Sequence, residues 1–163
     1  MARSHRSHPS HRSLITALFA ALVAVHAGLS WPPALVVAFF SGGMALAFLA
    51  EAVGVALGLV RHHTRPRVAG VPLHVVAAWP AVGYLAYRFA RVFVPADARA
   101  VLVAALVATA VDAFLDPLGV DAEAWSYPDH PLSGLRFRGV PWWNAVAWFV
   151  LVALTASIPL LWR

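Results

Sequence analysis

The sequence contains no cysteine and no lysine, and only seven of its residues are acidic. Without cysteine, disulfide bonds and thiolate chemistry are excluded. Only 12% of the 163 residues are charged and 61% are hydrophobic, whereas a soluble domain has about 25% charged residues. The composition therefore predicts an all-α integral membrane protein with a single membrane domain.

Long apolar runs predict five membrane-spanning helices within one membrane domain, residues 14–163. We place the helices at about 14–29, 34–60, 71–94, 98–117 and 141–162, with a long cytoplasmic loop at 118–140. The first run is short enough for a signal peptide, but its basic flank and the runs that follow favour a retained helix. Residues 1–13 form a basic arm that we expect to be disordered. Its three histidines are an alternative metal site: His5, His8 and His11.

All 12 basic residues are arginines, and they lie at the ends of the apolar runs and in the connections. Although the net charge is +5, this placement is typical of cytoplasmic anchoring and argues against nucleic-acid binding. With the N-terminus inside, eight arginines fall on the cytoplasmic side and four on the other. We therefore expect a multi-pass plasma-membrane protein with its N-terminus inside and its C-terminus outside.

The sequence contains an internal repeat. Gly70-Val71-Pro72 is followed by Ala78-Trp79, and the same pattern recurs 69 positions later as Gly139-Val140-Pro141 and Ala147-Trp148. Each copy opens an apolar run, and each follows a run that carries acidic residues. The second and third runs therefore resemble the fourth and fifth, which predicts a two-helix unit used twice in parallel orientation.

Three acidic residues lie in the apolar runs. Asp112 and Asp116 are four positions apart and share one helix face, and Glu51 lies in the second run. Charge in hydrocarbon is costly, so such residues are candidate functional groups. From the rise per residue, Glu51 lies roughly 14 Å and Asp112 roughly 9 Å below the inner surface, whereas Asp116 lies at the rim.

Other polar and aromatic residues fall in the same half of the membrane, namely Trp79, Trp148 and Asn144. No arginine is expected in the inner half of any run, so the two deeper acids have no cationic partner, which favours a functional site. The alternative is structural packing, in which arginines lock the helices by pairing with Asp116. The candidate partners are Arg61, Arg136 and Arg138.

The residues in this half fit acid catalysis. A carboxyl group in an apolar pocket favours its neutral form and can act as a general acid. We expect Glu51 or Asp112 to be this acid and Asp116, nearer water, to be the base. Three tryptophans offer faces that stabilise a cation: Trp79, Trp143 and Trp148. Protonation of an isolated alkene in a lipid-soluble substrate, followed by addition of water, fits this set.

We predict neither a metal nor a cofactor. The sequence has no zinc-ligand spacing, no phosphate-binding glycine loop and no nucleophile elbow. The acids are also compatible with Mg²⁺ and a polyprenyl diphosphate, but Asp112-x-x-x-Asp116 has no second Asp-rich motif to face it. His62 and His63 are adjacent in a loop and therefore poor chelators, so we expect a solvated basic turn there. Gly54-x-x-x-Gly58 predicts a close helix approach.

Several motifs combine in this chain. They are Glu51-x-x-Gly54-x-x-x-Gly58, Gly70-Val71-Pro72-Leu73 with Trp79, Asp112-Ala113-Phe114-Leu115-Asp116-Pro117, Trp125, and Gly139-Val140-Pro141-x-x-Asn144-x-x-x-Trp148-Phe149. Together they resemble the membrane carotenoid hydratase family, which includes bisanhydrobacterioruberin hydratase and bacterial carotenoid 1,2-hydratases. The resemblance implies addition of water to the terminal double bond of an acyclic carotenoid end group, without a redox cofactor. It also implies a carotenoid substrate, contact with membrane lipid, and other carotenoid-pathway enzymes as partners.

We assign catalysis to the three carboxyl groups of Glu51, Asp112 and Asp116. The substrate-binding residues that we expect are Trp79, Trp125, Trp143, Asn144 and Trp148. The chain departs from the family after Gly58, where Arg61-His62-His63-Thr64 replaces an aromatic stretch, and this leaves a non-catalytic subunit or carotenoid-binding partner as an alternative. A small transporter is a further alternative, but the outer half of the acid-bearing runs carries no ionisable group.

Overall fold

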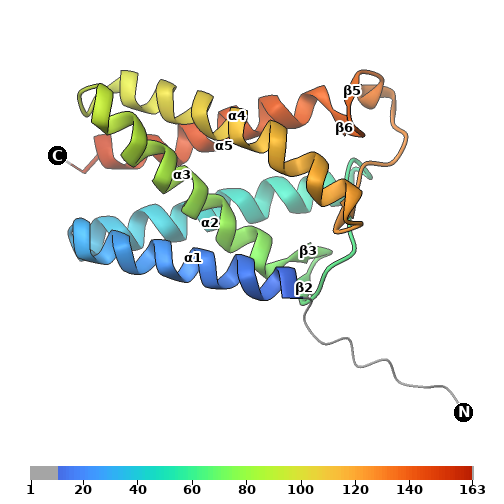
Figure 1. Cartoon of the computed structure of the whole chain (residues 1–163), viewed down its shortest axis with the longest axis horizontal. Helices are drawn as coiled ribbons and strands as arrows, with labels where there is room; N and C mark the ends of the chain where they lie inside the picture. Colours follow the sequence, from blue (N-terminus) through green and yellow to red (C-terminus); the bar gives the residue numbers. More distant parts are fainter. Residues whose placement is uncertain (1–10, 163) are drawn as a thin grey trace, which may run out of the picture.

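The computed structural model describes residues 11–162, which form a bundle of five long helices with short strands at one end (Figure 1). The long helices are α1 (His11–Ser30), α2 (Pro33–Ala56), α3 (Leu73–Phe93), α4 (Ala98–Asp121) and α5 (Trp142–Ser157). Two short 3₁₀ helices are η1 (Pro131–Ser133) and η2 (Ile158–Leu160). Most of the expected N-terminal arm, including His5 and His8, lies outside the described residues, and His11 is the first residue of α1. The all-α class is confirmed.

Four of the described helices are long and apolar enough to cross a membrane. The candidate spans are Ser13–Ser30, Pro33–Ala56, Ala98–Asp121 and Trp142–Leu160. The helix α3 is not among them, because polar and charged residues such as Arg88 and Arg91 lower its hydropathy. These helices confirm the membrane fold, while the five-span count and the orientation stay predictions.

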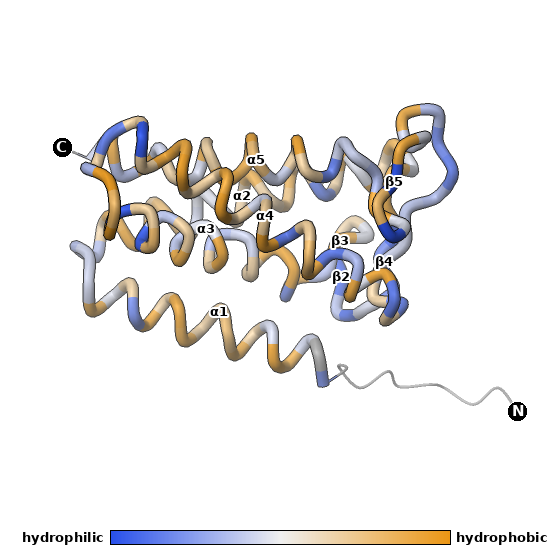
Figure 2. Tube along the Cα trace, turned by 45° about the horizontal axis from the view of Figure 1, so that its top comes forward, coloured by the Kyte–Doolittle hydropathy of each residue, from blue (hydrophilic) through white to orange (hydrophobic). Residues whose placement is uncertain are grey.

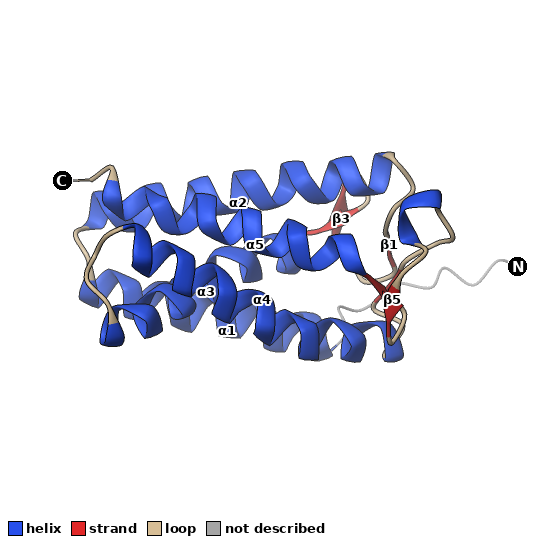
Figure 3. Cartoon of the chain, turned by 90° about the horizontal axis from the view of Figure 1, so that it is seen from above, coloured by secondary structure: helices blue, strands red, loops and turns tan. Residues whose placement is uncertain are grey.

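Six two-residue strands lie at the end of the bundle where α1 begins, opposite the C-terminus (Figures 1 and 3). They are β1 (Arg61–His62), β2 (Arg67–Val68), β3 (Val71–Pro72), β4 (Trp125–Ser126), β5 (Arg136–Phe137) and β6 (Val140–Pro141). Polar residues also gather at this end, whereas apolar residues cover most of the helices (Figure 2). We call it the hairpin end.

The two hairpins that precede α3 and α5 have the same geometry. In β2–β3 Arg67 pairs with Pro72, and in β5–β6 Arg136 pairs with Pro141, so the register is conserved at an offset of 69 residues. Each turn needs two left-handed residues. These are Ala69 and Gly70 in the first hairpin, and Arg138 and Gly139 in the second. The predicted repeat is therefore present in the backbone of both hairpins.

The C-termini of α2 and α4 also match each other. The amide of Leu59 donates to the carbonyl of Gly54, and 65 positions later Ala124 donates to Gly119. Each helix thus ends in a Schellman motif whose left-handed residue is Gly58 (φ 72°) or Glu123 (φ 54°). The expectation that Gly58 supports a close helix approach is wrong, because its position requires left-handed backbone and a Cβ there would meet nothing within 4 Å.

Small residues hold α3, α4 and α5 together. Alanines of α3 and α4 form most of one buried cluster, with Val152 and Ala156 of α5. Small side chains let helix backbones approach closely, which is how membrane helices gain contact energy in the absence of a hydrophobic driving force. Gly43 of α2 serves the same purpose, because a Cβ there would lie 2.8 Å from the side chain of Pro80 on α3. This packing fixes α4 and α5 side by side.

Candidate functional site

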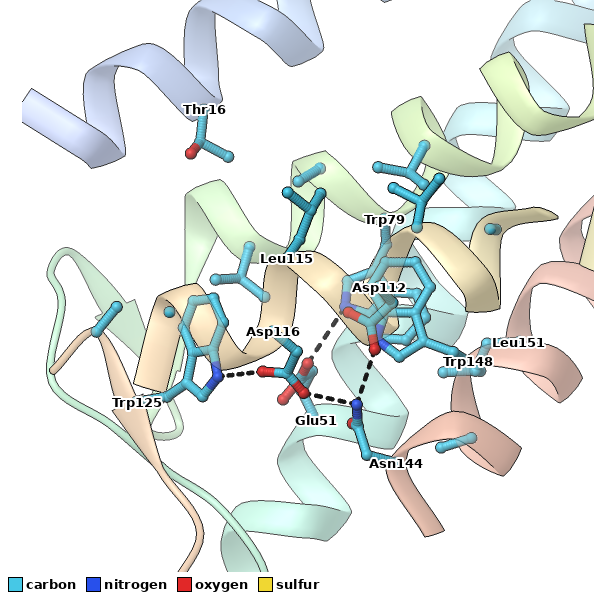
Figure 4. Close-up of a pocket in the computed structure, with 18 of the residues that line it drawn as sticks. Thr16, Glu51, Trp79, Asp112, Leu115, Asp116, Trp125, Asn144, Trp148 and Leu151 are labelled. Carbon is cyan, nitrogen blue, oxygen red and sulfur yellow. Dashed lines mark hydrogen bonds between the residues drawn. The ribbon is translucent and has the colours of Figure 1, made fainter. Parts of the chain in front are cut away.

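A large cavity with a volume of about 1280 Å³ lies between the helices, and residues of the hairpin end form part of its wall. Its wall contains every residue that the sequence predicts for the site: Glu51, Trp79, Asp112, Asp116, Trp125, Trp143, Asn144 and Trp148. Figure 4 shows that the three carboxyl groups point toward one another from α2 and α4. The expected convergence is therefore present, and the catalytic roles of these residues stay a prediction.

Two buried carboxyl groups share a single amide. Asp112 and Asp116 lie on one face of α4 and are only 7% and 3% exposed. The Nδ2 group of Asn144, in the first turn of α5, donates to Asp112 Oδ2 at 2.9 Å and to Asp116 Oδ2 at 2.6 Å (Figure 4). An amide nitrogen carries two hydrogens, so Asn144 satisfies one oxygen of each acid. This bridge holds two acidic groups within one small volume that is shielded from water.

Asp116 receives two further hydrogen bonds from β4 and the residue that follows it. The indole of Trp125 donates to Oδ1, and the hydroxyl of Tyr127 donates to Oδ2 at 2.7 Å. Burial and the neighbouring Asp116 charge raise the pKa of Tyr127 well above its ordinary value, so the hydroxyl stays a donor. The expectation that Asp116 lies at a wet rim is wrong, because α4 continues to Asp121 and encloses it.

Two of the three arginines that we considered as partners of Asp116, Arg136 and Arg138, bind elsewhere. Arg136 donates to the carbonyl oxygens of Tyr127, Pro128, Ser133 and Gly139, and it lies 3.5 Å from Asp129. Arg138 pairs with Asp121 at 2.5 Å. The donors that bind Asp112 and Asp116 are uncharged, and neither Arg136 nor Arg138 pairs with Asp116.

Glu51 is paired with a histidine that we expected in a solvated turn. The Nε2 atom of His62 lies 2.9 Å from Glu51 Oε2, and the indole of Trp79 donates to Oε1 at 3.2 Å. His62 is only 5% exposed, so the expectation of a solvated turn is wrong for this residue. The neighbouring His63 is exposed and contacts Ser126. Among the described residues, no group of three potential ligands is arranged to hold a metal ion.

Glu51 and Asp116 occupy equivalent places in the two repeats. They are 65 positions apart, and each lies three residues before the glycine whose carbonyl accepts the Schellman hydrogen bond. Each also pairs with a residue eleven positions later: His62 or Tyr127. Sequence reasoning missed both of these partners. The signal was available as Glu-x-x-Gly-Val at 51–55 and Asp-x-x-Gly-Val at 116–120. This equivalence also corrects the expectation that Glu51 lies much deeper than Asp116.

Aromatic rings form the wall of the site between the carboxyl groups and the apolar interior. The rings of Trp79 and Trp148, which are equivalent in the two repeats, stack with centroids 3.8 Å apart. The ring of Trp143 meets Tyr127 edge to face at 5.6 Å. Their π faces favour positive charge and bury apolar surface. The set can therefore accommodate a cation that forms in a dry pocket.

Beyond these rings the cavity continues as an apolar groove. Its walls come from three helices: Ile15, Thr16 and Phe19 of α1, Val82, Leu85 and Phe89 of α3, and Val107, Val111 and Leu115 of α4. The helix α1 has no counterpart in the repeat, and it packs mainly against α3. Ile15 and Val111 line the groove and are nevertheless 67% and 41% exposed, so the groove reaches the surface of the bundle. A hydrocarbon chain can lie in such a groove with one end at the carboxyl groups.

The sequence matches the family model described as carotenoid biosynthesis protein over residues 11–163. No curated protein and no solved structure matches the chain. The family match covers nearly the whole sequence, including all five long helices and both hairpins. The apolar groove with a polar end is consistent with a role in the synthesis of long lipid-soluble polyenes. The chain belongs to the carotenoid biosynthesis protein family.

Proposed function

We propose that this protein is a carotenoid hydratase, which adds water to the terminal double bond of an acyclic carotenoid end group by acid catalysis. The observation that carries the proposal is the pair of buried carboxyl groups that share Asn144 at the closed end of an apolar groove. Family membership supplies the carotenoid pathway, and the pair supplies a group that can protonate a carbon–carbon double bond. The residues present require no redox cofactor for this reaction.

The hydrogen bonds distinguish the two acids of the pair. Asp116 accepts hydrogen bonds from Trp125, Tyr127 and Asn144, whereas Asp112 accepts one from Asn144 alone among the described residues. Two negative charges this close in a dry pocket repel each other, so the arrangement favours one proton on the pair. We place the proton on Asp112, because the donors around Asp116 stabilise its charged form.

The reaction balances with the groups in the cavity. Asp112 gives its proton to the hydrogen-bearing carbon of the terminal double bond. The other carbon of this double bond, which carries two methyl groups, becomes a tertiary carbocation. A water oxygen forms the new C–O bond to this cation, and the second water proton passes to Glu51. The product is a tertiary alcohol. The stacked Trp79 and Trp148 stabilise the cation through their π faces.

The groove explains how a long substrate reaches these groups. The polyene chain lies between α1 and α4 against α3, and its end group meets Asp112. Because the groove reaches the exposed surface of the helices, the substrate enters from the lipid without crossing water. The short hairpins close the polar end, where water arrives. We therefore assign the apolar groove to the carotenoid chain and the polar end to water.

We infer that the hairpin end faces the cytoplasm of a plasma-membrane protein. The hairpins, β1 and the loop between β1 and β2 contribute five arginines, which support this orientation by the positive-inside rule. Arg88, Arg91 and Arg99 lie toward the other end of α3 and α4. A tag accessible only after permeabilisation, placed in the loop between β5 and β6, supports the orientation. The same tag labelled in intact cells contradicts it.

The test of the function is pigment analysis in a bacterium that accumulates lycopene. Expression of the wild-type chain should give carotenoids that carry a tertiary hydroxyl group at one or both ends. Asp112→Asn keeps the size of the side chain and loses the acidic proton, and should give none at an equal membrane level. Absence of hydroxylated pigment from well-expressed wild type contradicts the proposal, and an Asp112→Asn variant with wild-type conversion contradicts the role of Asp112.

A further inference from the structure

His62 has a polar atom that the site described above does not use. Its Nε2 bonds to Glu51, but its Nδ1 is buried and has no hydrogen-bond partner among the described residues. The side chain is 3% exposed and lines the cavity. Buried polar atoms are almost always paired, and where protein offers no partner an ordered water takes that place. The cavity beside His62 is polar and large enough for water.

A second histidine places another free nitrogen in the same region. His74, at the start of α3, lines the cavity, and its Nδ1 is also buried without a partner. Its Nε2 lies 3.4 Å from the hydroxyl of Thr64, and it is close enough to His62 for their charges to interact. The three side chains of His62, Thr64 and His74 line the same cavity as Glu51, and they bring two unpaired imidazole nitrogens to its wall. A water molecule needs two to four such partners.

The two repeats differ in the partner of their carboxyl group. Tyr127 holds Asp116 with a hydroxyl whose pKa is raised well above its ordinary value, so that it remains a fixed donor. His62 holds Glu51 in the equivalent place. An imidazole offers two ring nitrogens, whereas the phenol offers a single hydroxyl group. His62 can therefore bind Glu51 through Nε2 and a water molecule through Nδ1 at the same time.

We propose that His62 is a positioning residue that holds the attacking water beside Glu51 and passes on the proton that this water releases. The inference rests on the proposed hydration. When the water oxygen bonds to the carbocation, its second proton moves to Glu51 and through His62 and a further water returns to Asp112. Alkene and water are consumed, the alcohol is formed, and all three residues recover their starting protonation states.

The experiment compares purified variants in lipid nanodiscs with lycopene as substrate. His62→Gln can still donate to Glu51 but cannot relay a proton, and should reduce kcat by about 100-fold, a typical share for acid–base assistance. His62→Ala should regain activity when imidazole is added. His63→Gln, the exposed neighbour, should keep wild-type kcat. Imidazole should not restore Tyr127→Phe, because the hydroxyl group that this variant loses acts as a fixed donor to Asp116.

The outcomes separate this inference from the proposed function. A wild-type protein without hydrated product refutes the function and the inference together. If wild type is active, a His62→Gln kcat within about twofold of wild type refutes the relay alone. If His62→Ala elutes as a folded protein from size exclusion and its reduced kcat does not recover in imidazole, His62 has a structural role, and this result also refutes the relay. Slow His62→Gln together with imidazole rescue supports it.

Discussion

Gly119 gives the most direct route to a defined disturbance of the site. It lies in the last turn of α4, directly under the indole of Trp125. A Cβ added at Gly119 would lie 2.0 Å from Cζ2, 2.3 Å from Cη2 and 2.5 Å from Cε2 of this ring. No flexible chain end is involved, so the whole indole must move. We therefore expect Gly119→Ala to displace Trp125 and to break its hydrogen bond to Asp116.

The size of the effect follows from that bond. A hydrogen bond to a charged group contributes about 1.5–3 kcal/mol, which corresponds to a rate change of about 10- to 150-fold if it is lost in the transition state. We expect kcat/KM for hydration to fall within this range. The unfolding free energy should also fall, because overpacking of a filled site costs about 1–3 kcal/mol.

Gly83→Ala is the matched control, because a Cβ at this position in α3 meets nothing within 4 Å. Replacing a helical glycine there should leave hydration unchanged and stabilise the protein by about 0.5–1 kcal/mol. Both variants are measured for hydration in nanodiscs, thermal unfolding and tryptophan emission. Unchanged emission and wild-type kcat/KM in Gly119→Ala would show that Trp125 does not support the site.

Three further predictions test other parts of the account. Glu123→Gly relieves the left-handed backbone that closes α4 and should raise the unfolding free energy by about 1 kcal/mol; a lower value in thermal unfolding contradicts the Schellman assignment. Val111→Trp fills the groove and should raise KM at least about 10-fold. Leu106→Trp, which is exposed on the same helix and outside the groove, should leave KM unchanged. The same KM in both variants would argue against the substrate path. The pKa of Tyr127 is raised in the folded protein. The unfolding free energy of wild type should therefore fall above about pH 10, where tyrosine ionises in the unfolded chain, and that of Tyr127→Phe should fall less. The same dependence of the unfolding free energy on alkaline pH in both proteins would contradict the burial of this hydroxyl.

Much of the architecture follows from local signals in the sequence. Apolar runs define the helices, and the repeated Gly-Val-Pro motif marks the two hairpins, because glycine supplies the left-handed second residue of each turn. The i, i+4 spacing of Asp112 and Asp116 places both on one helix face, and the predicted clustering of polar residues toward one end of the helices agrees with the contact of Asn144 with both acids. These are short-range consequences of helix geometry, which explains why sequence reasoning finds them.

The depth of the acids was less predictable, because hydropathy does not mark where a helix ends. The Schellman motifs end α2 at Ala56, earlier than the apolar run, and the helix α4 continues through Pro117 to Asp121. These two shifts place Glu51 and Asp116 at equivalent positions. The role of His62 was missed for another reason: its contact with Glu51 depends on the pairing of β1 with β4, which joins segments 65 residues apart.

The central claim is that the oxygen of the product comes from water and that a carboxyl proton is delivered to carbon. Labelled water tests both parts in one measurement, with purified protein in nanodiscs, lycopene, and a solvent of D₂¹⁸O. We predict that mass spectrometry shows one ¹⁸O and one non-exchangeable deuterium for each new hydroxyl group, and that both are absent with Asp112→Asn. A hydroxylated product without ¹⁸O or without carbon-bound deuterium would contradict acid-catalysed hydration.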